Sequence, residues 1–270
     1  MSVVGQIPPA IAAALPAPAP DAPRAVFVRA FEYPQGYPGH THRHRLAQVV
    51  YPVRGVVSVE ASTGTSVLTR LTALAIPPWL DHRVAAHGNA SLRSVFVDPD
   101  RHPTLVTDLV TLHVSELLHE LIREAGRHYT DFDDDGGVGA AVVCLIVQLL
   151  PSMPTSDTSV WLPQIEHPLL RGVADALDLD PADPTAAEEW ARRLALSTRH
   201  FSRLFKQETG VTFSTWRSLH HVKHALVLLA SGHSVTRVAM DLGYGSTSAF
   251  IEMFKRCTGR TPGASLAREL

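Results

Sequence analysis

Four side chains near residue 200 have the types and spacing to bind DNA. Positions i, i+3, i+4 and i+7 lie on one side of a helix, and this spacing joins Arg199, Ser202, Arg203 and Lys206. Arginine can bind guanine through two hydrogen bonds, while lysine and serine can reach phosphates. Taken alone, such a face is more typical of solvated surface. The repeat described next favours DNA contact.

The motif F-x-x-x-F-K-x-x-T-G occurs twice, at residues 201–210 and 250–259. A fixed offset of this kind is typical of a duplicated structural unit. Each copy follows a short predicted helix with an inward-facing alanine, Ala191 or Ala239, and then a turn. Two helices across a tight turn form a helix-turn-helix. We therefore predict two units, at about residues 187–208 and 234–257.

The first copy has clear helix signals: Ser197 can cap its beginning and Gly210 can end it. The second copy has a weaker basic face, formed by Ser248, Ile251 and Lys255. Glu252 stands where the first copy has Arg203, and a carboxylate near phosphate lowers affinity. We expect the first unit to supply most of the base reading and the second to anchor.

One long amphipathic helix is predicted between the two units. Its apolar residues recur every three or four positions before Ser231-Gly232: Phe213, Trp216, Leu219, Val222, Leu226 and Leu229. A helix of this length spans roughly 25 Å. It can hold two recognition helices about one DNA turn apart, ~34 Å, on one face of a duplex.

Residues 168–266 resemble the DNA-binding domain of the AraC/XylS family of bacterial transcription regulators. The resemblance rests on residues 190–197, 201–206, 225–232, 235–245, 248–250, 254–255 and 259–262. It implies a regulator that binds promoter DNA. His221 replaces an arginine that is common in the family, and Ala195 replaces the usual glycine of the first turn. We expect a DNA-backbone contact near His221 to be weaker or pH-dependent.

Residues 25–103 alternate short apolar runs with turn residues, which predicts an antiparallel β barrel or sandwich. Two segments within it resemble the signature motifs of the cupin barrel: Gly36-x5-His42-x-His44-x3-Gln48-x6-Gly55 and Pro77-x-Trp79-x2-His82. Gln48 stands where the first motif usually has glutamate, and Trp79 where the second has glycine.

The cupin resemblance implies that His42, His44, Gln48 and His82 converge on one divalent metal. On a strand, His42 and His44 would point to the same side. Three imidazoles suit Zn, Fe, Ni or Mn rather than Ca or Mg, and the neutral Gln48 is a poorer ligand than glutamate. The alternative is a ligand pocket or packed barrel in which the histidines only form hydrogen bonds.

The remaining segments complete the predicted organisation. Residues 104–150 are expected to be mostly helical, either mediating dimerisation or packing on the barrel. Residues 151–163 are predicted to link this region to a DNA-binding domain at 164–270, and residues 1–24 to form a disordered arm. The predicted fold class is α+β multidomain, with an N-terminal cupin-like antiparallel β barrel, a helical extension and a C-terminal all-α double helix-turn-helix domain.

Charge is unevenly distributed along the chain of 270 residues. Residues 185–270 contain 12 Lys and Arg against 6 Asp and Glu, whereas the other residues contain 12 against 20. A basic rear part is expected to meet a polyanion. Only Cys144 and Cys257 are present, which indicates a reducing cytoplasm without a disulfide framework. The longest apolar run, 140–150, is too short to span a membrane.

These patterns predict a one-component transcription regulator and no enzyme. Its expected partners are double-stranded promoter DNA, a metal or small-molecule effector, RNA polymerase if it activates, and a second copy if it dimerises. Two alternatives stay open: a cupin metalloenzyme (dioxygenase or isomerase) fused to a DNA-binding domain, and an architectural nucleic-acid binder without effector. Gln48 in place of an acid argues against the enzyme.

Overall fold

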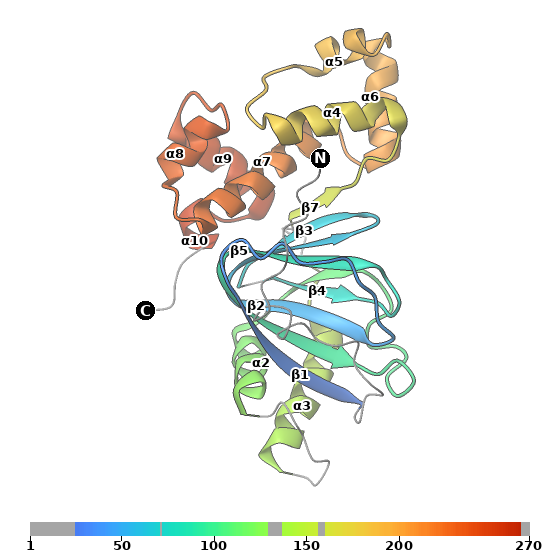
Figure 1. Cartoon of the computed structure of the whole chain (residues 1–270), viewed down its shortest axis with the longest axis vertical. Coiled ribbons are helices and arrows are strands. Elements are labelled where there is room, and N and C mark those ends of the chain that lie inside the picture. Colours follow the sequence, from blue (N-terminus) through green and yellow to red (C-terminus); the bar gives the residue numbers. More distant parts are fainter. Residues whose placement is uncertain (1–24, 71, 129–136, 156–159, 266–270) are drawn as a thin grey trace.

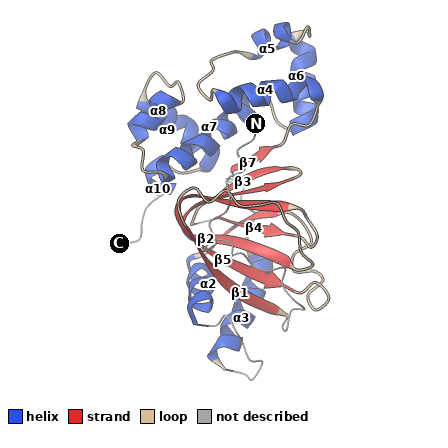
Figure 2. Ribbon diagram, in the orientation of Figure 1, coloured by secondary structure: helices blue, strands red, loops and turns tan. Residues whose placement is uncertain are grey.

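The computed structural model describes residues 25–70, 72–128, 137–155 and 160–265. The predicted N-terminal arm, residues 1–24, lies outside the described residues. An antiparallel sheet with two helices on one side occupies one end of the molecule, and a helical region occupies the other (Figures 1 and 2). None of the described helices is long and apolar enough to cross a lipid bilayer.

In the part of the chain that the structure describes, the sheet has seven strands, all paired antiparallel: β1 (Val26–Tyr33), β2 (Ala47–Ala61), β3 (Gly64–Leu68), β4 (Thr72–Ile76), β5 (His82–Val97), β6 (Val110–His113) and β7 (Val160–Pro163). The strands follow the order β1-β5-β2-β3-β7, and β4 joins β2 to β6. Across the described residues the sheet does not close. The prediction of an antiparallel sheet domain is confirmed, whereas a closed barrel is not.

Strands β2 and β5 are the long central pair of this sheet, because they pair along most of their length. Strand β2 continues through register shifts between Pro52 and Val56. Gly55 lies at this irregularity with φ 84°, and a Cβ there would lie 2.6 Å from the carbonyl oxygen of Asn89. Glycine therefore lets the two long strands approach each other.

Helices α2 (Glu116–His128) and α3 (Val138–Leu149), followed by the short η1 (Leu150–Ser152), pack against the sheet. Leu118, Ile122 and Ile146 are fully buried in one core with strand residues such as Val28 and Val95. Of the two roles expected for residues 104–150, the structure shows packing on the sheet. The helical prediction is wrong at 110–113, where β6 extends the sheet beside β4.

The segment expected to be a linker contains a strand. Its composition is rich in Pro, Ser and Thr, yet Val160–Pro163 pairs with β3 as β7. Val160 and Leu162 are buried. Four residues with two apolar side chains give too little periodicity to stand out in sequence, and the pairing is decided by contact with a strand nearly one hundred residues earlier.

Within residues 160–265 seven helices follow: α4 (Pro168–Leu179), α5 (Ala187–Arg193), α6 (Thr198–Thr209), α7 (Phe213–Ala230), α8 (Val235–Asp241), α9 (Thr247–Thr258) and α10 (Pro262–Ser265). One apolar core joins α4, α5, α6 and the beginning of α7, and a second joins the end of α7 to α8 and α9. Helix α7 thus connects two helix clusters (Figure 1).

Candidate DNA-binding surface and histidine cluster

The two predicted helix pairs are both formed, and their turns match. In the first pair, the amide of Leu196 donates to the carbonyl of Ala191 over 2.9 Å, and in the second the amide of Tyr244 donates to Ala239 over 2.9 Å. The turn residue is left-handed in both, with φ 55° at Ala195 and 76° at Gly243. Alanine pays a steric cost in this conformation that glycine does not.

Helices α6 and α9 also agree in their caps. The hydroxyls of Ser197 and Ser246 accept from amides three residues later, at 3.2 Å in each helix. Both helices end on left-handed glycines, and both bury two phenylalanines completely: Gly210 and Gly259, Phe201 and Phe205, Phe250 and Phe254. The repeat in sequence is therefore a repeat in structure.

The basic face predicted on α6 is exposed to solvent. Its four members all lie on the outer side of the helix, opposite the buried phenylalanines: Arg199, Ser202, Arg203 and Lys206. Their cationic groups form no ion pair with an acidic side chain among the described residues. By contrast, Arg192 and Arg193 on α5 are neutralised by Glu189 at 2.7 and 3.1 Å.

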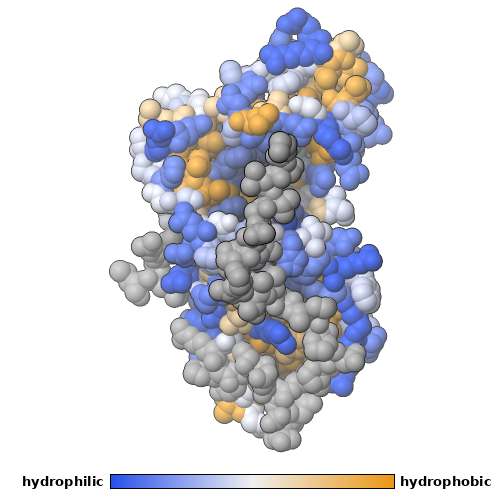
Figure 3. All heavy atoms as spheres, in the orientation of Figure 1, coloured by the Kyte–Doolittle hydropathy of each residue, from blue (hydrophilic) through white to orange (hydrophobic). Residues whose placement is uncertain are grey.

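The corresponding face of α9 is more mixed. Ser248 and Lys255 are exposed, while Ile251 is half-buried against the second core. Glu252 is exposed on the same face. The surface at the far end of the helical region is hydrophilic at its tip, with a hydrophobic patch beside it (Figure 3).

His221 lies in the middle of α7 and points into the domain. Its Nδ1 lies 2.8 Å from the hydroxyl oxygen of Tyr244, and the side chain is half-buried. Burial lowers its pKa to about 4, and the neighbouring His220 acts in the same direction. Burial also raises the pKa of Tyr244 to about 12. The pair ties α7 to the turn between α8 and α9.

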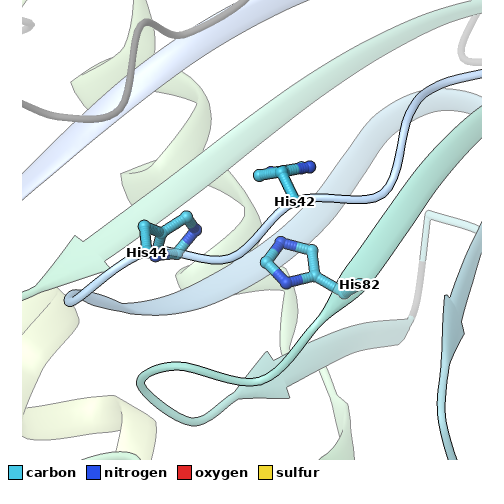
Figure 4. Close-up of side chains that lie close together, drawn as sticks. All are labelled: His42, His44 and His82. Carbon is cyan, nitrogen blue, oxygen red and sulfur yellow. The ribbon is translucent and has the colours of Figure 1, made fainter.

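The front region brings three predicted ligand residues together. A ring nitrogen from each of His42, His44 and His82 lies within 4.8 Å of the others. His42 and His44 precede β2 instead of lying on it, and two backbone hydrogen bonds of 2.9 Å join His42 to His82 at the start of β5. Figure 4 shows the three rings gathered between these two segments.

Gln48 completes the cluster from β2. Its Oε1 lies 3.1 Å from Nε2 of His44 and 3.2 Å from Nε2 of His82, and its Nε2 donates to the Ser94 hydroxyl at 2.8 Å. Gln48 and His82 are buried, and His42 and His44 are half-buried. All four predicted residues are therefore neighbours.

Backbone carbonyls hold the other nitrogen of each ring. Nδ1 of His42, His44 and His82 lies 3.0, 2.7 and 2.8 Å from the oxygens of His40, Leu46 and Leu80 respectively. A carbonyl oxygen can only accept, so each Nδ1 carries a proton. Burial lowers the pKa of His82 to about 4, and burial lowers the pKa of His44 as well. These two rings are neutral at physiological pH, with Nε2 unprotonated.

The sheet and the helical region share an apolar core. Val56 of β2, Val67 of β3 and Val160 of β7 pack with Val222 and Leu226 of α7. A cavity of about 180 Å³ lies beside this contact, lined in part by His113, Thr258 and Arg260. β2, which carries Gln48, and β5, which begins at His82, therefore belong to the same sheet that supports the central helix.

A second cluster was missed in the sequence analysis. Asp178 of α4 meets His220 and His224 of α7, with one ligand atom from each within 4.8 Å of the others. The spacing His-x3-His on a predicted helix places two imidazoles on one face and could have drawn attention to the pair. The carboxylate, forty-two residues earlier, could not be assigned to it from sequence.

Comparison with known proteins agrees with the helix-pair geometry. Residues 190–268 match the family described as "Helix-turn-helix domain". The chain is 31% identical over 227 residues to the HTH-type transcriptional regulator NimR of Escherichia coli, covering 84% of this chain and 82% of NimR. It is 41% identical over 92 residues to the regulator RipA of Corynebacterium glutamicum, covering 34% of this chain and 28% of RipA.

Among solved structures, ToxT of Vibrio cholerae covers 90% of this chain and 98% of its own, at 9% identity and a TM-score of 0.37. The helix pairs and the family match define a helix-turn-helix DNA-binding protein. The relationship to NimR extends over most of both chains. The chain belongs to the AraC family of transcription regulators, and its function is DNA-binding regulation of transcription.

Proposed function

We propose that the chain is a one-component regulator that reads operator DNA through two helix-turn-helix units and senses a divalent transition metal in its front domain. Residues 25–163 are the sensor in this proposal and residues 164–270 the DNA-binding domain. The sensor role rests on one observation: three atoms with lone pairs, one of them Oε1 of Gln48, face one another in the front cluster.

Three acceptor atoms face one another in the front cluster. Nε2 of His44 and Nε2 of His82 carry lone pairs, because their Nδ1 atoms hold the ring protons. Oε1 of Gln48 also carries lone pairs and lies 3.1 and 3.2 Å from them. Acceptors repel at this distance unless a cation lies between them, and a metal ion satisfies all three.

The supporting hydrogen bonds are those that metal sites use. Metal-binding histidines usually donate their other ring nitrogen to a carbonyl or carboxylate, which sets the tautomer and the ring orientation. His42, His44 and His82 all have this partner. The donor set of three imidazoles and an amide oxygen suits Zn, Fe, Ni or Mn. Without metal, rotating the Gln48 amide by half a turn would let its NH₂ group donate to the imidazoles.

Helix α6 is the better candidate for base reading. Arg199, Arg203 and Lys206 are exposed and form no ion pair with acidic side chains among the described residues, so they can bind phosphate or guanine without first breaking an ion pair. On α9, the corresponding residues Ser248, Ile251 and Lys255 include only one cationic side chain, Lys255. The Glu252 carboxylate on the same face would repel phosphate. This arrangement supports unequal halves, with α6 dominant.

The route from sensor to DNA runs through α7 in this proposal. β5 begins at His82 and reaches Gly88, which lies against the end of α7, and β2 carries both Gln48 and the α7-contacting Val56. A metal that draws His82 toward Gln48 therefore acts on strands that support α7. Since α7 lies between the two helix pairs, its position sets their relative orientation.

The test uses the full chain and promoter fragments from its own locus. We expect retarded migration of at least one fragment at low ionic strength, and a change in operator affinity when Zn, Fe, Ni or Mn is added. Gln48→Glu should tighten metal binding, because a carboxylate is the better ligand. Gln35→Glu, the same change at an exposed site of the front domain, should not.

The two halves of the proposal fail separately. If no fragment from the locus is retarded at low salt, the operator-binding half is wrong. If no metal raises the unfolding temperature and Gln48→Glu behaves as Gln35→Glu does, the metal-sensing half is wrong and the front histidines only form hydrogen bonds.

A further inference from the structure

The helical region contains a second group of metal-ligand side chains, about which the proposed function makes no statement. Asp178 lies near the end of α4, and His220 and His224 lie one turn apart on α7. Nε2 of His220 lies 2.9 Å from Oδ1 of Asp178, and Nε2 of His224 lies 3.5 Å from the same oxygen. The two Nε2 atoms are 3.2 Å apart.

These positions are set by packing. His220 is fully buried, and its ring stacks on Trp216 with centroids 5.2 Å apart and planes 19° apart. Trp216 shares a core with Val173 and Leu177 of α4, so the two helices that carry the ligands are pressed together. The three ligand atoms are held in place before anything binds, which lowers the entropic cost of binding.

The triangle has the dimensions of a coordination face. Ligands at 2.0–2.1 Å from a tetrahedral zinc ion lie about 3.3–3.4 Å from one another. The three observed edges, 2.9, 3.2 and 3.5 Å, bracket that value. Two imidazoles and one carboxylate leave one position of a tetrahedron open, and His224 and Asp178 both reach solvent.

We propose that Asp178, His220 and His224 bind a divalent transition metal of the zinc class and thereby join α4 to α7. The ion takes the place of the imidazole protons that otherwise hydrogen-bond to Asp178. Since α4 packs with the first helix pair and α7 connects both pairs, the ion stabilises the frame that holds α6. The site lies outside the front cluster and does not depend on it.

Two features make this site the weaker of the two. Nζ of Lys223 lies 3.5 Å from Oδ1 of Asp178, so the ion must displace an ammonium group. Lys223 is one-quarter exposed and can turn into solvent. Nδ1 of His220 is buried and finds no hydrogen-bond partner among the described residues, whereas all three front histidines have a carbonyl.

The experiment is a calorimetric titration of the full chain with Zn²⁺, repeated with Co²⁺ to record the visible absorption of a tetrahedral site. We expect two equivalents for the unmodified chain. His224→Gln and Asp178→Asn, both at sites that reach solvent, should each remove the weaker equivalent. His233→Gln, an exposed histidine outside the cluster, is the matched control and should leave both.

Lys223→Met supplies a test in the opposite direction. Removal of the competing ammonium should tighten the weaker equivalent about tenfold while leaving the stronger one unchanged. His44→Gln with His82→Gln should remove the stronger equivalent and retain the weaker. If the unmodified chain binds a single equivalent and this double variant keeps it, the sensor proposal is wrong and this one stands.

The outcomes that overturn the proposal are specific. If His224→Gln and Asp178→Asn bind Zn²⁺ as the unmodified chain does, the site is wrong. It is equally wrong if Lys223→Met leaves the weaker affinity unchanged. In either case the cluster acts only as a hydrogen-bonded clasp between α4 and α7.

Discussion

Gly88 of β5 lies against the carbonyl oxygen of Ala230, the last residue of α7. A Cβ at position 88 would lie 2.5 Å from that oxygen, and the backbone there has φ 73°. Both the contact and the conformation require glycine. Since β5 begins with His82, six residues earlier, a single strand connects the histidine cluster to the helix between the two helix pairs.

Replacing Gly88 should weaken this connection. We expect Gly88→Ala to lower the free energy of unfolding by about 1–2 kcal/mol, because the new methyl group meets backbone and the left-handed conformation is strained. The effect of metal on operator affinity should also decrease. Urea unfolding and fluorescence anisotropy with labelled operator measure the two quantities.

Gly172→Ala is the matched control for that substitution. Gly172 lies within α4, and a Cβ there would meet nothing within 4 Å. Alanine should therefore stabilise the helix slightly and leave the metal response unchanged. A Gly88→Ala protein with unaltered stability and an unaltered metal response would show that the contact with Ala230 transmits nothing.

Helices α6 and α9, the two that we propose to contact DNA, should contribute unequally to operator affinity. Arg203→Ala is expected to cost about 1–3 kcal/mol of binding free energy and to relax specificity at one base position. Lys206→Ala should cost more than Lys255→Ala, the equivalent change in α9. Anisotropy titrations at several salt concentrations separate base contacts from phosphate contacts.

A charge change in α9 tests the same asymmetry. Glu252→Gln should raise operator affinity, because it removes an exposed carboxylate from the face that we propose to meet phosphate. Arg192→Ala, in the ion pair with Glu189 on α5, is the control and should change affinity little. If Lys255→Ala lowered operator affinity as much as Lys206→Ala does, α6 and α9 would contribute equally and the proposed ranking would be wrong.

The two turns offer a reciprocal pair of substitutions. Ala195→Gly should raise the free energy of unfolding by about 0.5–1 kcal/mol, because it relieves a left-handed alanine with φ 55°. Gly243→Ala should lower it by more, since φ is 76° there and the Cβ would approach the carbonyl oxygen of Ala182 to 3.1 Å. Chemical denaturation measures both changes in the free energy of unfolding. If the two substitutions changed it in the same direction, the interpretation of Ala195 as a strained left-handed residue would be wrong.

Acid should destabilise the helical region through His221. Burial lowers the pKa of His221 to about 4, against an ordinary value of 6.5. Between these values the unfolded chain binds a proton that the folded chain does not, so stability rises with pH. His221 therefore does not lower the free energy of unfolding well above pH 6.5, and that free energy falls by about 3 kcal/mol as pH drops from 6.5 to 4.

The measurement is the urea midpoint as a function of pH. His221→Gln, which cannot titrate in this range, should flatten the profile between pH 6.5 and 4. His233→Gln removes an exposed histidine of the same region and should leave the slope as it is. A slope that survives in His221→Gln would assign the acid sensitivity to other groups, such as His44 and His82.

Local signals were sufficient for the helix pairs. Ser197 and Ser246 cap their helices, Gly210 and Gly259 end them, and the phenylalanines recur with helical spacing. Each of these signals acts within about four residues of its partner, so the chain's own order reveals them. The family resemblance drawn from the same residues was confirmed for the same reason.

Long-range pairing set the limits of the prediction for the front region. β7 lies in a segment that resembled a linker, β6 lies in one that resembled a helix, and the sheet does not close across the described residues. Each of these features depends on which distant strand supplies hydrogen bonds. Hydrophobic periodicity carries no information about that choice in segments of four residues.

The sequence by itself determined the duplicated pattern of helix pairs, because motif spacing and periodicity are properties of neighbouring residues. Its resemblance to the cupin motifs pointed to the four residues that the structure places side by side. Only the tertiary structure decided that Nδ1 of each front histidine faces a carbonyl and that Gly88 touches Ala230. It also brought Asp178 to His220 and His224. The last two relationships join atoms far apart in the chain, and packing, not local propensity, sets their distances. The histidine–carbonyl contacts span only two residues, but they depend on the backbone conformation of the segments before β2 and β5.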